Sequence, residues 1–344
     1  MLMKNVNFVV LAAGKGTRMK SSVPKVLHKL AGRSMLRHVI DATNAVGESK
    51  KVIVTGHGAE QVEEKFESSD TKFVRQEDQL GTAHAVSMAI PELCEDAIVV
   101  VLYGDVPLIK ENTLKELIDS SNDGISILTT VLDKPFGYGR VRKDRDGNAI
   151  AIIEEKDATE DEKNINEIFT GVLCARTDFL KEGLLEIKDD NAAGEFYLTD
   201  IVSIMSNKGI KINTYVASND EVKGANSHRE LAELEGIFRE MKAQDILDMG
   251  ITVSDPSRLD VRGEVTSGKD CSIDVNVILE GNVELGDNVS IGLWSDASAA
   301  IAISQRGRQL GGLRLRGAAG RPQKRRALSG GQLNFSSSAP RFLP

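Results

Sequence analysis

Short apolar runs alternate with amphipathic stretches along residues 7–227. The clearest runs predict β-strands at residues 8–12, 51–55, 97–103 and 124–131. Between them, apolar residues at spacings of three and four predict helices at residues 33–46, 83–90 and 113–121. This alternation predicts an α/β domain in which helices link parallel strands.

The apolar pattern changes after residue 227. Residues 228–249 have apolar side chains at spacings of three and four among charges, which predicts one linker helix. Beyond it an aliphatic residue or cysteine heads each of five hexads, with a second aliphatic residue two places after most of them: Val265, Cys271, Val277, Val283 and Val289, then Ile273, Leu279, Leu285 and Ile291. A period of six is typical of a left-handed β-helix, in which three short strands make one coil. Two hairpins would also alternate, but five consecutive hexads favour the solenoid.

Charge is distributed unevenly along the chain. After Asp296 there are nine basic residues and no acidic one, so the net charge of −8 divides into −17 for residues 1–296 and +9 for residues 297–344. The hexads stop after Leu293, and the Gly-, Ala- and Ser-rich segment that follows has no apolar period, which predicts an unstructured basic tail. No aromatic residues interleave with its cations, so a solvated extension is favoured over an RNA- or DNA-binding function.

We therefore expect four parts: residues 1–227, 228–250, 251–293 and 294–344. The 344 residues, with 41% apolar side chains, are typical of folded globular domains. The three cysteines lie far apart without a C-x-x-C pair, which argues against a disulfide framework or a cysteine-rich zinc site and favours the cytoplasm. No apolar run is long enough for a membrane span or a signal-peptide core, so no membrane association is expected.

A glycine-rich turn follows the first predicted strand and contains the sequence Leu11-Ala12-Ala13-Gly14-Lys15-Gly16-Thr17-Arg18-Met19, with Pro24-Lys25 shortly after. Glycines at such a position let backbone N–H groups approach phosphate, and the cations supply positive charge. The spacing excludes the dinucleotide fingerprint, which needs glycine at position 19, and the Walker loop, which needs Ser or Thr after Gly-Lys. With Arg18 and Lys25 included, the segment resembles the signature of sugar-1-phosphate nucleotidyltransferases.

Further segments resemble the same enzymes in the same order. Gln76 with residues 80–85 resembles a uracil-reading loop, although Gly81-Thr82 is also an ordinary helix start. The strand at residues 98–103 delivers Asp105 at its carboxyl end, where open α/β sheets bind ligands and where a carboxylate suits Mg²⁺. An ordinary turn aspartate before Pro107 is the alternative. Residues 136–140, 153–157, 195–200 and 224–226 complete the set.

Together with the hexads, this set resembles the bacterial bifunctional N-acetylglucosamine-1-phosphate uridylyltransferase/glucosamine-1-phosphate acetyltransferases over residues 6–293. The resemblance implies a Rossmann-like nucleotidyltransferase domain that makes UDP-N-acetylglucosamine and pyrophosphate from UTP and N-acetylglucosamine 1-phosphate, for cell-envelope precursors. It also implies Mg²⁺ held by Asp105 and Asn226, with Arg18 on the leaving pyrophosphate and Lys25 on the phosphates. Substrate contacts are implied for Leu11, Ala12, Ala13, Gly14, Gln76, Gly81, Thr82, Tyr103 and Gly104, and sugar contacts for Gly139, Glu154 and residue 169.

Two departures from the family pattern change the expectation. Phe169 stands where the family has Asn, so an amide expected to bond the sugar is replaced by an apolar ring. The family's long β-helix, which forms homotrimers and the acetyl-CoA site, has no counterpart after Leu293. We therefore expect no acetyltransferase activity and a mostly monomeric chain. The alternatives are a uridylyl- or thymidylyltransferase for another sugar 1-phosphate, or a weakly catalytic scaffold or RNA-binding protein.

Overall fold

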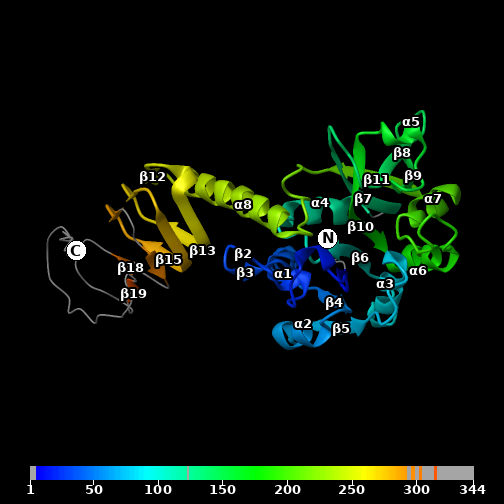
Figure 1. Cartoon of the computed structure of the whole chain (residues 1–344), viewed down its shortest axis with the longest axis horizontal. Helices are drawn as coiled ribbons and strands as arrows, with labels where there is room; N and C mark the ends of the chain where they lie inside the picture. Colours follow the sequence, from blue (N-terminus) through cyan, green and yellow to red (C-terminus); the bar gives the residue numbers. More distant parts are fainter. Residues whose placement is uncertain (1–4, 122–123, 293–295, 299–301, 304–313, 316–344) are drawn as a thin grey trace, which may run out of the picture. The chain divides into compact units, whose positions relative to one another are not determined.

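The computed structural model describes residues 5–121, 124–292, 296–298, 302–303 and 314–315. The chain divides into two units, Met1–Ile237 and Phe238–Pro344, which are described separately. Figure 1 shows strands and helices alternating through the first unit, and mainly strands in the second after the long helix α8 (His228–Asp248).

The first unit is built on a nine-stranded sheet. Its main path runs in the order β11-β7-β10-β6-β1-β4-β5, and β8 and β9 extend it beside β10. The strands are β1 (Val6–Ala12), β4 (Lys50–Thr55), β5 (Thr71–Arg75), β6 (Ile98–Tyr103), β7 (Gly124–Val131), β8 (Arg140–Lys143), β9 (Ala149–Ile153), β10 (Glu167–Arg176) and β11 (Lys211–Val216). A short hairpin, β2 (Lys29–Leu30) with β3 (Arg33–Ser34), forms a separate sheet.

Helices cover both faces of the sheet (Figure 1). They are α1 (Met35–Val46), α2 (Ala59–Phe66), α3 (Thr82–Ala89), α4 (Glu111–Ser120), α5 (Glu160–Lys163), α6 (Thr177–Glu186) and α7 (Asp200–Asn207), with the 3-10 turns η1 (Thr17–Met19), η2 (Lys25–Leu27) and η3 (Ile90–Glu92). Successive side chains of a strand point to opposite faces. Val9 and Leu11 of β1 therefore join a core with α3, α6 and α7, whereas Phe8 and Val10 join a core with α1, α2 and α4.

The predicted α/β class is confirmed, and the predicted elements occur within about two residues of their expected ends. The helix predicted to start at residue 33 starts at Met35, because Arg33 and Ser34 pair with β2. One central strand differs from the expected parallel arrangement. β10 runs antiparallel to both β6 and β7. The periodicity of a buried strand is the same in both directions, so its direction follows from the connections.

The second unit contains parallel strands that stack in register. β13 (Leu259–Ser267) pairs with β15 (Val277–Leu285), with Leu259 opposite Val277 and Val265 opposite Val283. On another face, β12 (Thr252–Val253), β14 (Ser272–Ile273) and β16 (Ser290–Ile291) stack in the same way, and η4 (Pro256–Arg258) lies between β12 and β13. All five residues that head the hexads are buried in one core. These stacked strands agree with the predicted start of a β-helix.

The strand pairing continues past the predicted end of the hexads. β17 (Asp296–Ser298) and β18 (Ala302–Ile303) pair in parallel with β15, and β19 (Arg314–Leu315) pairs antiparallel with β17. This differs from the unstructured segment expected over residues 294–344. The physical reason is that a strand edge offers backbone donors and acceptors, which pair with any sequence. The remaining residues of that segment, with most of its arginines, lie outside the described residues.

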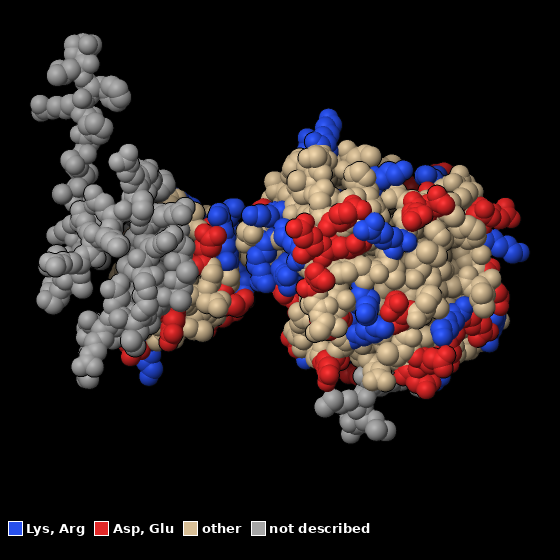
Figure 2. Space-filling model, turned by 90° about the horizontal axis from the view of Figure 1, so that it is seen from below, with Lys and Arg blue, Asp and Glu red and all other residues tan. Residues whose placement is uncertain are grey.

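Among the described residues, no helix is long and apolar enough to span a membrane. Figure 2 shows acidic and basic side chains intermixed over one face of the first unit. Such mixing is typical of a solvated protein surface.

Candidate functional site

A cavity of about 270 Å³ opens beside the carboxyl ends of β1 and β6. These two strands are neighbours in the sheet, with Leu11 opposite Tyr103. Ten residues predicted from the sequence line the cavity: Leu11, Ala12, Ala13, Gly14, Lys25, Gln76, Gly81, Thr82, Tyr103 and Asp105. Gly104 adjoins them, because its N–H donates to the carbonyl of Leu11 at 3.0 Å. Open α/β sheets bind ligands at this edge.

The glycine-rich turn is shaped around Lys25. Gly16 has a φ of +57°, and a Cβ there would lie 2.8 Å from the Cβ of Lys25. Glycine is therefore required twice, for its backbone conformation and for its close approach to Lys25. Gly14 lies in open space, with no atom within 4 Å of an added Cβ. This leaves the backbone around Gly14 accessible from the cavity.

Lys25, Asp105 and Asn226 meet at one point. The ammonium of Lys25 donates to Oδ2 of Asp105 at 2.6 Å and to Oδ1 of Asn226 at 3.0 Å. The side chains of Lys25 and Asp105 are only 16% and 10% exposed. A carboxylate and an amide oxygen thus converge on one cationic centre, in an environment where charges interact more strongly than in water.

These two oxygens fit a hard divalent cation. Mg²⁺ binds protein through one or two carboxylate or carbonyl oxygens and completes its shell with water and substrate phosphates. Among the described residues, no cluster of three or more His, Cys, Asp or Glu side chains forms a complete metal cage. The arrangement therefore suits a metal that is shared with a phosphate ligand.

A second loop contributes Gln76 and Gly81 to the lining of the cavity. Gln76 is 5% exposed, and its Nε2 donates to the carbonyl of Gly81 at 3.0 Å. Gly81 has a φ of +118°, and a Cβ there would lie 2.5 Å from the carbonyl oxygen of Phe196. The Phe196 N–H donates to Leu80 at 2.8 Å, so the loop is fixed to the segment around residue 196. These contacts fix Gln76 in the lining of the cavity.

Tyr103, which lines the cavity, and Glu154 are half-buried polar residues whose charges interact. Desolvation, together with the carboxylates of Glu154 and Asp105, raises the pKa of Tyr103. Burial also raises the pKa of Glu154, with the nearby carboxylate of Asp200 adding to the effect. The hydroxyl of Thr199 donates to Oε1 of Glu154 at 3.0 Å. Hydroxyl-rich ligands suit such a group, because a partly desolvated carboxyl gains from each hydrogen bond that replaces lost water.

Three further predicted residues, Gly139, Arg18 and Phe169, are not among those that line the cavity. Gly139 adjoins Glu154, since a Cβ there would lie 3.6 Å from Oε1 of Glu154. Arg18 is exposed on η1 and does not line the cavity. Phe169 is 7% exposed and packs in the apolar core that contains α3 and α7.

The structure adds residues that the sequence did not single out. Gln79 and Glu195 line the cavity, and Nε2 of Gln79 donates to the carbonyl of Ala13 at 2.6 Å. Thr199 holds Glu154. Glu195 and Thr199 lie in the segment 195–200, whose resemblance to the nucleotidyltransferases was the only sequence feature that pointed to them. Gln79 lies three residues after Gln76 and carried no separate signal.

Comparison with known proteins gives three results. The family model described as a MobA-like NTP transferase domain matches residues 8–154. The chain is 50% identical over 285 residues to a bifunctional protein GlmU of Paraburkholderia phymatum, covering 82% of this chain and 63% of that protein. It is 44% identical over 292 residues to the GlmU of Marinobacter nauticus, covering 84% of this chain and 64% of that protein.

Solved structures share the fold of the first unit. A UDP-glucose pyrophosphorylase complexed with UDP-glucose superposes with a TM-score of 0.57 at 16% identity, covering 69% of this chain and 99% of that one. A chain described as a glucose-1-phosphate thymidylyltransferase from Bacillus anthracis gives a TM-score of 0.55 at 18% identity, covering 67% and 94%. At these identities the likeness concerns the fold alone.

The family match places residues 8–154 among NTP transferase domains. Over the aligned residues the chain is a homologue of the bifunctional GlmU proteins. It spans a little under two thirds of the length of these relatives.

Proposed function

We propose that the chain transfers a uridylyl group from UTP to N-acetylglucosamine 1-phosphate and releases pyrophosphate. The observation that supports this most directly is one cavity lined by the glycine-rich turn, the Gln76 loop, Lys25 and Asp105, with Asn226 bonded to the Lys25 ammonium. In the proposed reaction a phosphate oxygen of the sugar attacks the α-phosphorus of UTP. The new P–O bond forms as the bond to the leaving pyrophosphate breaks.

No covalent bond to the protein is needed for this exchange. The protein's contribution is to align the two substrates and to compensate the charge that develops on the phosphates. The accessible backbone around Gly14 suits the triphosphate, and Gln76 and Gly81 suit the base. Arg18, exposed on η1, is a cation that can meet the outer phosphates, while Lys25 is held at the inner ones.

Asp105 and Asn226 are the residues we propose to hold Mg²⁺. When bound, the ion would neutralise phosphate charge and help to fix the α-phosphate. The Lys25 ammonium already contacts both oxygens, so it must move towards the phosphates when a metal is bound. The chain thus has two cationic groups for one region of negative charge.

Phe169 lies in the apolar core, so the sugar specificity depends on other groups. Glu154, Thr199 and Gly139 supply polar groups around the proposed sugar position. Uridylyl or thymidylyl transfer to another sugar 1-phosphate is the alternative.

A pyrophosphate-release assay with UTP, Mg²⁺ and a panel of sugar 1-phosphates tests the proposal. We expect turnover with N-acetylglucosamine 1-phosphate and less with glucose 1-phosphate or with other nucleotides. Asp105→Asn should abolish most activity and weaken Mn²⁺ binding measured by electron paramagnetic resonance. Asp161→Asn, which changes an exposed carboxylate of α5, is the matched control. Absence of turnover with every sugar, or an Asp105→Asn variant with the wild-type rate, would contradict the proposal.

A further inference from the structure

An ion pair between a buried arginine and a half-buried glutamate lies where the turn at residues 136–139 joins strand β8. Arg140 is 2% exposed, and its Nη2 lies 2.5 Å from Oε2 of Glu155. Its Nη1 donates to the carbonyl of Tyr138. Removing a guanidinium from water is costly, and of its nitrogens Nε has no partner among the described residues, so the contacts of Nη1 and Nη2 hold Arg140 in one orientation. The hydrogen bond from Arg140 lowers the pKa of Glu155, which keeps this carboxylate ionised.

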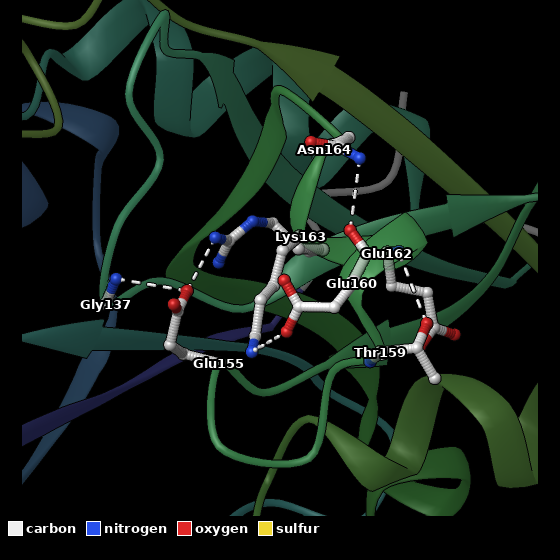
Figure 3. Close-up of polar contacts among 8 residues, drawn as sticks. Gly137, Glu155, Thr159, Glu160, Glu162, Lys163 and Asn164 are labelled. Atoms are coloured by element: carbon white, nitrogen blue, oxygen red, sulfur yellow. Dashed lines mark hydrogen bonds and ion pairs between the residues drawn. The ribbon is translucent and has the colours of Figure 1, made fainter.

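The same carboxylate also holds the turn. The Gly137 N–H donates to Oε2 of Glu155 at 3.2 Å, as Figure 3 shows. Gly137 has a φ of +83°, a conformation in which glycine is favoured. Glu155 therefore fixes the tip of the turn through Gly137 and its base through Arg140.

The network adjoins two residues proposed to contact the sugar. Gly139 directly precedes Arg140, and Glu154 directly precedes Glu155. Arg140 lies opposite Ile153 in the β8–β9 ladder. A Cβ at Gly139 would lie 2.8 Å from Cγ2 of Ile152 and 3.6 Å from Oε1 of Glu154, so the Gly139 backbone lies against the Glu154 side chain. The ion pair therefore joins the two segments whose separation sets the sugar position.

Stability alone does not explain an ion pair to a buried arginine at this place. The hairpin already has the β8–β9 ladder and a core made by Val141, Ala149 and Ile152. A buried ion pair adds little net stability compared with apolar side chains of the same volume. Its larger effect is geometric, because a guanidinium that contacts both Glu155 and the Tyr138 carbonyl, and a carboxylate shared with Gly137, restrict the backbone that they bridge.

We infer that Arg140 and Glu155 are positioning residues for the sugar 1-phosphate, which keep the 136–139 turn and Glu154 in the geometry that binds the sugar. This inference rests on the proposed function. Neither side chain needs to touch the substrate. Loss of the pair should therefore weaken sugar binding while leaving the nucleotide side of the cavity unchanged.

Two variants separate the contributions. Glu155→Gln keeps an oxygen that accepts from Gly137 but removes the charge that pairs with Arg140. Arg140→Lys keeps the charge but loses the planar fork that reaches Glu155 and Tyr138 together. Arg142→Lys is the matched control, because Arg142 lies on the same strand and pairs with Glu162 at 3.3 Å, with its side chain 48% exposed.

The experiment measures pyrophosphate release while each substrate is varied, and calorimetric binding of UTP and of the sugar 1-phosphate. We expect both variants to raise the KM for the sugar 1-phosphate at least fivefold, with the KM for UTP within twofold of wild type. Arg142→Lys should match wild type. Unchanged sugar KM, or an equal loss of sugar and UTP binding, would overturn the positioning role and mark the pair as a general stabiliser. Wild-type protein without turnover on any sugar would instead overturn the proposed function, and this inference with it.

Discussion

Gly16→Ala tests whether the glycine-rich turn exists to place Lys25. At this position φ is +57°, where alanine costs about 1–2 kcal/mol relative to a right-handed conformation. The added Cβ would also lie 2.8 Å from the Cβ of Lys25, whereas 3.4 Å is the lower end of ordinary contact. Lys25 must therefore move by about 0.6 Å or the turn must open by the same amount.

This displacement should affect activity more than stability. Lys25 contacts Asp105 at 2.6 Å, so a shift of its backbone disturbs the cluster proposed to bind the α-phosphate and the metal. A misplacement of about 1 Å in an active site can cost on the order of 100-fold in rate. We expect Gly16→Ala to lower kcat by about tenfold or more, or about 1.4 kcal/mol in the barrier.

Gly209→Ala supplies the control for backbone strain alone. Gly209 has a φ of +80°, and an added Cβ meets no atom within 4 Å. Backbone strain should cost each variant about 1–2 kcal/mol of stability in urea unfolding, and Gly16→Ala should lose more than Gly209→Ala because of its close contact with Lys25. Only Gly16→Ala should lose activity. A Gly16→Ala variant with wild-type kcat would refute the idea that this turn positions Lys25.

Three further variants test other parts of the molecule. Arg18→Ala should lower kcat far more than it raises the KM for UTP, because a cation meeting the leaving pyrophosphate acts mainly as charge develops; an effect confined to KM contradicts that role. Phe169→Asn should tighten N-acetylglucosamine 1-phosphate binding several-fold in calorimetry, since one hydrogen bond contributes about 0.5–1.5 kcal/mol. It should also lower the Tm, because the ring leaves the core. The hydrogen bond from buried Lys51 lowers the pKa of Asp70 to about 2, below the ordinary 3.8. This pair therefore stabilises the fold above about pH 4 and ceases to do so as the pH falls towards 2. Asp70→Asn should lose stability at pH 6 in urea unfolding, and its difference from wild type should shrink below pH 4; an equal difference at both pH values contradicts the assignment.

Much of the fold was predictable from the sequence because the apolar period is strong. The strands at β1, β4, β6 and β7 are continuous apolar runs, and the hexads place one small aliphatic residue or cysteine at each turn of a narrow core. The direction of β10 was not predictable in the same way. A strand buried on both faces has the same pattern whether it runs parallel or antiparallel.

In the candidate site, residues within one loop were predictable and contacts between distant segments were not. Residues within one loop, such as Gly14 and Gly16, are recognisable because their spacing is local. The contact between Glu155 and Gly137 joins two segments separated by a hairpin, and Gln79 reaches Ala13 across 66 residues. Such contacts depend on how the strands are paired, so no local pattern in the sequence predicts them.

The stacking of the second unit restricts how its length can vary. Equivalent positions in successive coils are 18 residues apart, as for Ser272 and Ser290, whose hydroxyls bond at 3.0 Å. An insertion of 18 residues would add one complete coil and return every later side chain to its own face, whereas six residues would move each of them to the next face. Gly263 adds a second restriction, because a Cβ there would lie 2.1 Å from the carbonyl oxygen of Gly281 in the coil above. A coil inserted at this level must therefore carry glycine at the same corner.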